Sequence, residues 1–135
     1  MKRLLSIRYS ATSFDLAMLI LRVCAGILMI PHGYTKLVNF EQASGKFLNF
    51  LGLGSTVSLS LDIFAEFFCS IFIILGLFTR LAAIPLVIAM FVAISMAHNF
   101  QVFTEGERAS LFFLIFLTIL FVGPGRISLD ALIRK

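Results

Sequence analysis

Polar side chains that can carry acid–base chemistry interrupt an otherwise apolar stretch at positions 55–78. Four of them recur at every fourth position: Ser58, Asp62, Glu66 and Ser70. On an α-helix this spacing places all four on one face. A charged group in the centre of a membrane costs about 3 kcal/mol or more, and it is usually paired or functional. The two acids are therefore expected to face other helices, where they can bind a ligand or relay protons.

A second line of polar side chains lies in the stretch 15–37. Arg22, His32 and Lys36 are joined by spacings of three and four through Ala25 and Met29. This pattern puts them along one line of a helix, which can face the acids of the second stretch. The long guanidinium of Arg22 is expected to lie deeper than the other two and to meet the second helix around positions 66–70.

These side chains predict one polar pocket near one surface of a membrane domain. A third apolar stretch brings a second histidine to the same side. The predicted pocket residues are Arg22, His32, Lys36, Asp62, Glu66 and His98. The alternative is a structural charge network that only fixes the order of the helices.

The two cysteines and the two histidines offer weaker possibilities. Cys24 and Cys69 fall at similar depths on neighbouring stretches, and a redox pair needs only that their α-carbons come within about 7 Å. The alternative is that both are free, small apolar side chains in a helix interface. The histidines have no metal-binding spacing, and phosphate loops, dinucleotide fingerprints and catalytic triads are absent from the sequence. We therefore expect no metal and no covalently bound cofactor.

The composition indicates what must position these residues. The chain has 135 residues, of which 60% are hydrophobic and 13% charged, with 16 Phe, and its mean hydropathy is +1.05. These values are typical of an integral membrane protein. The apolar stretches predict an all-α fold: a four-helix antiparallel bundle forming a single membrane domain over residues 1–135. The predicted spans are approximately 15–37, 56–78, 81–99 and 105–122, and the bilayer core that they cross is about 30 Å thick.

The basic residues predict the orientation of this bundle. The net charge is +4, but the basic side chains are scattered at helix ends, without the interleaved aromatic or glycine residues of a nucleic-acid surface. Most fall before the first span, in the second turn or after the last span: Lys2, Arg3, Arg8, Arg80, Arg126, Arg134 and Lys135. The positive-inside rule then predicts that both termini are cytoplasmic.

Two connecting segments are amphipathic. In the first external loop, 38–54, apolar Ala43, Phe47, Leu48 and Leu51 share one helical face, which predicts a short helix at the membrane surface. A re-entrant lid without ligand contacts fits the same pattern. After the helix-breaking sequence 123–125, Ser128 can cap a short C-terminal interfacial helix.

A set of short motifs, in order along residues 14–132, resembles the DoxX family of small bacterial four-helix membrane proteins. The motifs are Leu21-Arg22-Val23, Gly26, His32-Gly33, Lys36, Glu66, Gly76-Leu77, Thr79-Arg80-Leu81-Ala82, His98, Gly123-Pro124-Gly125-Arg126 and Ser128-Leu129-Asp130-Ala131-Leu132. The resemblance implies a multi-pass protein of the bacterial cytoplasmic (inner) membrane. Some members of the family are linked to quinone-coupled oxidation of thiosulfate, or to thiol and oxidative-stress complexes. Asp62 is not part of the pattern.

Two functions are compatible with these observations. In the first, the chain is the membrane subunit of an oxidoreductase system with a soluble or membrane partner, and its pocket binds a quinone, the one expected cofactor, or a small sulfur-containing anion. In the second, it is a non-enzymatic protein that binds or transports a small solute or lipid, or anchors a partner. In either case the Phe-rich faces left toward the lipid favour formation of a homo-oligomer.

Overall fold

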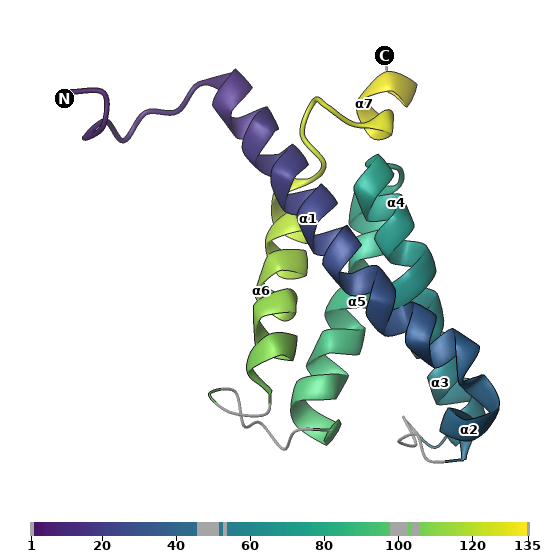
Figure 1. The fold of residues 1–135 in the computed structure, drawn as a ribbon. Helices are drawn as coiled ribbons and strands as arrows, with labels where there is room; N and C mark the ends of the chain where they lie inside the picture. The colour runs from purple at the N-terminus through teal and green to yellow at the C-terminus, as the bar shows by residue number, and fades with distance from the viewer. Residues whose placement is uncertain (1, 46–51, 53, 98–102, 104–105, 135) are drawn as a thin grey trace.

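The computed structural model describes residues 2–45, 52, 54–97, 103 and 106–134, and within these residues every regular element is a helix (Figure 1). The elements are α1 (Ala11–Val38), α2 (Phe40–Ser44), α3 (Ser55–Ile63), η1 (Phe64–Cys69), α4 (Ser70–Leu75), α5 (Thr79–Val92), η2 (Ala93–Ala97), α6 (Glu107–Val122) and α7 (Leu129–Ile133). The segments η1 and η2 are π-helical. The all-helical prediction is thus confirmed for the described residues.

Two of these helices are long and apolar enough to cross a membrane by length and composition: α1, and the continuous helix Ser55–Leu75 formed by α3, η1 and α4. A third apolar helix, Thr79–Ser95, is shorter. Only 33% and 44% of the residues in the most apolar windows of the two long helices are buried. Most of each apolar surface therefore faces outward, as expected for lipid contact, whereas the core helix of a soluble protein is mostly buried.

The first helix begins at Ala11, before the predicted start of its span at 15, and the bounds also differ at the turn between the second and third spans. The second long helix ends at Leu75 rather than near 78, because Gly76 adopts a left-handed conformation with φ of 70°. The next helix begins at Thr79 rather than at 81. The last residues of the predicted third span, from 98 on, and the first of the fourth span lie outside the described residues.

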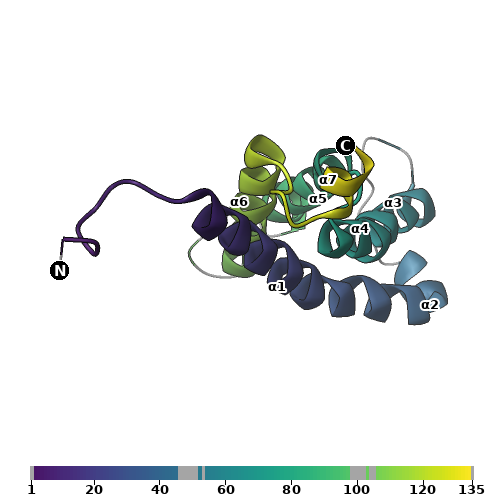
Figure 2. The ribbon, with the colours of Figure 1, turned by 90° about the horizontal axis from the view of Figure 1, so that it is seen from above.

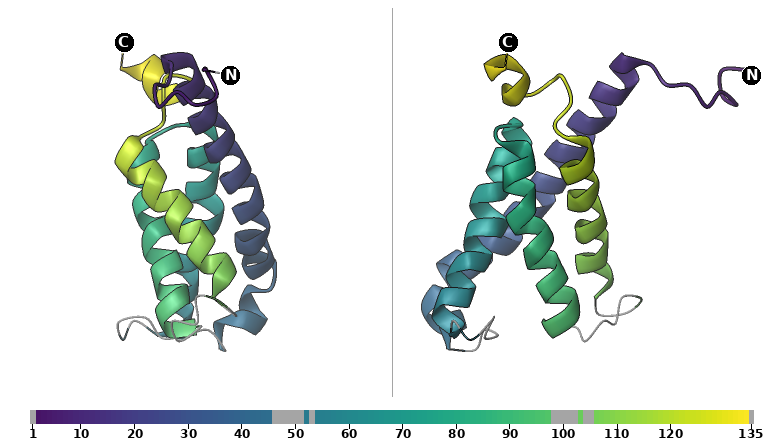
Figure 3. Two further views of the ribbon diagram at one scale, coloured as in Figure 1. Left: turned by 90° about the vertical axis from the view of Figure 1, so that its left-hand side faces the viewer. Right: turned by 180° about the vertical axis from the view of Figure 1, so that it is seen from behind.

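The long helices lie against one another with both chain termini at the same end of the molecule (Figures 1 and 3). Helix α1 packs against η1 and α4, α5 packs against α6, and η1 also contacts α5. Seen from above, α1 runs along one side of the other helices and the segment before it extends away from them (Figure 2). We refer to the end that carries both termini as the terminal end, and to the other, near α2, as the α2 end.

Close approach of α1 to the second long helix depends on two glycines. A Cβ atom placed on Gly33 would lie 2.8 Å from the backbone nitrogen of Phe67. One on Gly26 would lie 3.0 Å from the carbonyl oxygen of Ser70. Small residues at such positions let helix backbones approach closely where no hydrophobic effect drives association. The contact at Gly33 brings α1 directly against the π-helical segment that carries Glu66.

The C-terminal helix α7 covers the turn between α4 and α5. Ser128 caps α7, as predicted, by accepting a hydrogen bond from the amide of Ala131 at 3.2 Å. The carboxylate of Asp130 accepts hydrogen bonds from the amides of Phe78 at 2.8 Å and Thr79 at 2.9 Å. Its own amide donates to the carbonyl of Gly76 at 2.8 Å. Asp130 therefore caps the N-terminus of α5 from another helix.

This cap predicts a pH-dependent stability. Burial acts to raise the pKa of Asp130, but the hydrogen bonds from Thr79 and Phe78 outweigh it, so its pKa lies below the ordinary value of 3.8. Because the folded-state pKa is the lower one, the contribution is fully present above about pH 5 and is lost as the pH falls through that folded-state pKa. Asp130→Asn should lower the free energy of unfolding by about 1 kcal/mol at pH 7. In denaturant titrations the difference from wild type should shrink as the pH falls below 3.8, and it should vanish below the folded-state pKa.

The matched control for this prediction is Glu41→Gln, which removes an exposed acid from α2. A wild-type advantage over Asp130→Asn that is equally large at pH 3 and pH 7 would contradict the prediction.

Candidate functional site

The four regularly spaced polar residues of the second long helix, which we call the polar stripe, are Ser58, Asp62, Glu66 and Ser70. They face the interior of the molecule. Ser58, Glu66 and Ser70 are at most 4% exposed, and the side chain of Asp62 is 13% exposed. The hydroxyl groups of Ser58 and Ser70 donate to carbonyls one turn earlier in the same helix, both at 2.7 Å. The serines are therefore satisfied by their own backbone, whereas the two acids require a partner from another helix.

Lys36 of α1 is that partner. Its Nζ donates to both carboxylate oxygens of Glu66, at 2.9 Å each, and forms an ion pair with Asp62. The Lys36 side chain is 32% exposed and that of Glu66 is 5% exposed. One cation thus serves two acids, one of them buried, in a region where an unpaired charge is costly. The spacing of polar residues along the two helices predicted that Lys36 can face Asp62 and Glu66.

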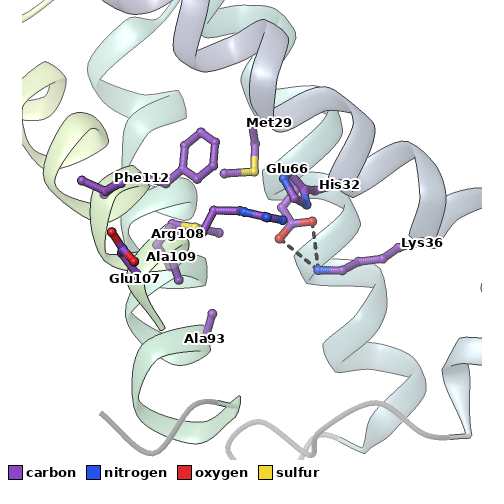
Figure 4. Close-up of a pocket in the computed structure, with 11 residues that line it drawn as sticks. Met29, His32, Lys36, Glu66, Ala93, Glu107, Arg108, Ala109 and Phe112 are labelled. Atoms are coloured by element: carbon purple, nitrogen blue, oxygen red, sulfur yellow. Dashed lines mark hydrogen bonds and ion pairs between the residues drawn. The ribbon is translucent and has the colours of Figure 1, made fainter. Parts of the chain in front are cut away.

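A cavity of about 650 Å³ opens beside this ion cluster, between α1, η1, the α5–η2 helix and α6 (Figure 4). Its lining residues are Met29, His32, Lys36, Glu66, Met90, Ala93, Glu107, Arg108, Ala109, Leu111 and Phe112. Glu66 belongs to η1 and Ala93 to η2, so both π-helical segments contribute to the wall. Such wide turns occur frequently at functional sites.

His32 and Arg108 face each other across this cavity. The ring of His32 meets the ring of Phe112 edge-on, with centroids 6.0 Å apart. The Arg108 guanidinium extends across the cavity toward His32 and Glu66, whereas the Glu107 carboxylate turns away from them (Figure 4). With the described residues Arg108 makes no hydrogen bond or ion pair. A guanidinium beside apolar Met29 and Phe112 is available to a ligand.

Sequence reasoning did not include Arg108 among the pocket residues. Its position in the first turn of the last long helix, beside Glu107, resembles that of an ordinary helix-end charge. The sequence signal that could have identified it is its basic charge at the end of a predicted span opposite to the end where most of the basic residues fall.

Arg22 does not reach this cavity. It is fully buried, and Nη1 donates to the carbonyls of Ile73 at 3.3 Å and Ile74 at 3.5 Å, while Nη2 donates to that of Ile127. It was expected between positions 66 and 70, but it lies one turn further toward the terminal end. The C-terminal carbonyls of a helix carry partial negative charge and attract the guanidinium there. Arg22 therefore ties α1, α4 and the C-terminal segment together.

The cysteines do not line the cavity, and His98 lies outside the described residues. Both cysteines are free, with Cys24 exposed and Cys69 buried, so the structure does not form the redox pair. In the described part of the chain, no three His, Cys, Asp or Glu side chains gather in a geometry that could hold a metal ion.

A second ion pair, at the terminal end, was not predicted. Asp15 is 6% exposed, and its carboxylate accepts hydrogen bonds from Nε of Arg126 at 2.6 Å and from the Arg126 amide at 3.0 Å. The turn after α6 places Arg126 over the first turns of α1. Only tertiary structure reveals this pairing, because the two residues are 111 positions apart.

Comparison with known proteins places this geometry in context. An uncharacterized membrane protein of Mycobacterium tuberculosis is 29% identical over 130 residues, covering 85% of this chain and 80% of its own length. An uncharacterized protein of Haemophilus influenzae is 32% identical over 120 residues, covering 82% of this chain and 85% of its own. No solved structure matches the chain significantly. The DoxX family model matches residues 17–99, the part that contains most of α1 together with Lys36, Asp62 and Glu66. The chain is therefore a membrane protein that belongs to the DoxX family.

Proposed function

We propose that this protein is the quinone-binding membrane subunit of an oxidoreductase system. The observation that carries the proposal is the cavity of about 650 Å³, which combines apolar walls with the hydrogen-bonding groups of His32, Glu66 and Arg108. Ligand sites of this kind are mostly apolar, with a few polar groups that fix the orientation of the ligand. Met29, Phe112 and Leu111 would contact the ring and the start of a lipid tail.

The balance of charges favours a neutral head group over a sulfur-containing anion. Among the described residues in and beside the cavity, three carboxylates, Asp62, Glu66 and Glu107, stand against two permanent cations, Lys36 and Arg108. Lys36 is already engaged by two of the acids. A small dianion therefore meets no surplus of positive charge, whereas a quinone carbonyl needs only a hydrogen-bond donor.

The cavity also holds groups that can supply protons. Conversion of a quinone to a quinol takes up two electrons and two protons. His32 and Glu66 are the side chains in the wall that can hold and release a proton near a carbonyl of the ring. The electrons would come from a partner protein, because no haem, flavin or iron–sulfur motif is present in the sequence.

The proposed setting is a four-helix antiparallel bundle that crosses the bacterial cytoplasmic membrane several times with both termini inside. The common position of the two termini at one end supports an even number of crossings (Figure 1). The basic residues Lys2, Arg3, Arg8, Arg126 and Arg134 all belong to the segments at that end, which is the distribution of a cytoplasmic face. The cavity would then open toward the outer half of the bilayer.

Passage of a solute through the molecule is less well supported than binding. The core residues Ile73, Leu86, Phe116 and Ile119 are all 0% exposed, and the equally buried Arg22 lies toward the terminal end. These buried side chains pack between the helices in the described region, which disfavours onward passage of a ligand from the cavity.

The test is binding of ubiquinone-1 to the purified protein in detergent, measured by calorimetry. We expect saturable binding, weakened about tenfold or more in Glu66→Gln, His32→Ala and Arg108→Gln, because each removes one polar contact of the ligand. Glu41→Gln and Arg8→Gln are the matched controls, since they remove exposed charges that do not line the cavity. Absence of binding by folded wild-type protein would contradict the proposal, and binding of thiosulfate instead would reverse the choice of ligand.

A further inference from the structure

A second cavity, of about 470 Å³, lies at the terminal end between the start of α5, the turn after α6, and α7. It is separate from the quinone cavity and shares no lining residue with it. Its polar wall is formed mainly by Thr79, Arg80, Asp130 and Arg134. In Figure 1 α7 stands over the ends of α4 and α5 at this place.

The charge available to a ligand in this cavity is positive. Arg80 approaches the carbonyls of Phe121 and Val122 only at 3.5 and 3.4 Å, so most of its five N–H donors are free for stronger bonds. The one acid, Asp130, is already satisfied by the backbone amides of Phe78 and Thr79. Two arginines, Arg80 and Arg134, therefore stand against one carboxylate in the lining of the cavity.

The rim of the cavity is apolar and exposed. Phe78, Leu81 and Ile133 expose 59%, 67% and 65% of their surface. In a membrane protein these side chains face lipid tails, and the arginines beside them lie at the level of the head groups. Phosphate-binding and tail-binding surfaces thus adjoin each other, which a free phosphate ion would not need.

We propose that this cavity binds the phosphate head group of an anionic phospholipid, held by Arg80 and Arg134, with the lipid tails along Phe78, Leu81 and Ile133. The site is independent of the proposed quinone function. It would couple α5 and α7 to the lipid composition of the surrounding leaflet.

The experiment compares lipid binding by native mass spectrometry of the full-length protein in detergent. The probes are dioleoyl phosphatidylglycerol, dioleoyl phosphatidylcholine and inorganic phosphate. We expect wild type to bind phosphatidylglycerol about tenfold or more tightly than phosphatidylcholine, since an arginine near an anionic head group is worth roughly a fivefold change in affinity. Arg80→Gln/Arg134→Gln should weaken phosphatidylglycerol binding on the order of 30-fold.

Arg3→Gln/Arg8→Gln is the matched control, because it removes two exposed arginines from the same end but outside the cavity; its affinity should stay within about twofold of wild type. If the double cavity variant does not fold, the single variant Arg134→Gln decides, with an expected loss of about fivefold. The proposal is overturned if the two lipids bind equally, if the control loses as much as the cavity variant, or if millimolar inorganic phosphate displaces the lipid.

Discussion

Replacing Arg22 with glutamine is expected to lower the free energy of unfolding by about 3 to 5 kcal/mol, because hydrogen bonds to charged groups are worth about 1.5 to 3 kcal/mol each and buried carbonyls are left without a donor. Arg22 is 0% exposed and donates to Ile73 and Ile74 at the end of one helix and to Ile127 in the C-terminal segment. A glutamine amide is too short to span these acceptors. Unfolding in mixed detergent–denaturant titrations measures the loss.

Two further variants show whether the guanidinium itself is responsible. Arg22→Lys keeps the charge but lacks the planar fork, so it should recover only part of the stability. Arg8→Gln removes an exposed arginine before α1 and should change the stability by less than about 0.5 kcal/mol. A variant Arg22→Gln as stable as Arg8→Gln would show that the three carbonyls are satisfied without Arg22.

Lys36→Met is expected to lower the free energy of unfolding by about 3 to 5 kcal/mol, as removal of one partner from a buried ion pair typically does. Asp62 and Glu66 would then face each other without a cation. By contrast, Asp62→Asn should change the stability by less than about 1 kcal/mol, because Lys36 keeps a complete pair with Glu66. The same unfolding titrations measure both variants.

The double variant Lys36→Met/Glu66→Gln separates charge from packing. It removes the buried acid together with its cation, so it should regain more than half of the stability lost in Lys36→Met alone. Equal stability of the single and the double variant would mean that the lysine stem, not its charge, holds α1 against η1.

Helix periodicity was sufficient to predict the central contact of the site. Spacings of three and four on α1, and of four on the second long helix, bring Lys36 to Asp62 and Glu66, and they need no knowledge of the tertiary fold. The inward direction of the stripe follows from the cost of charge in lipid. Gly26 and Gly33 then allow the two backbones to approach closely. Because Gly33 has no side chain, the backbone of Glu66 and Phe67 can lie against α1.

The remaining features depend on contacts that leave no periodic signal. Arg108 lines the cavity because α6, which carries it, packs on α5, and Asp130 caps α5 because the chain folds back after α6. Arg22 shares a helical line with Lys36 but contacts a different level of the second helix. Periodicity predicts the face on which a side chain lies, whereas its depth also depends on where the neighbouring helix ends, here at Gly76.

The contacts of the C-terminal segment bear on the order in which the chain is made. Arg22 binds Ile127, and Asp15 binds Arg126, so partners separated by 105 and 111 residues complete the surroundings of the first helix. A ribosome releases α1 long before it reaches these residues. During synthesis the first helix therefore carries a guanidinium and a carboxylate whose partners do not yet exist, and water or the insertion machinery must solvate them. The contacts of α1 with Arg126 and Ile127 can therefore form only after the C-terminal segment has been made.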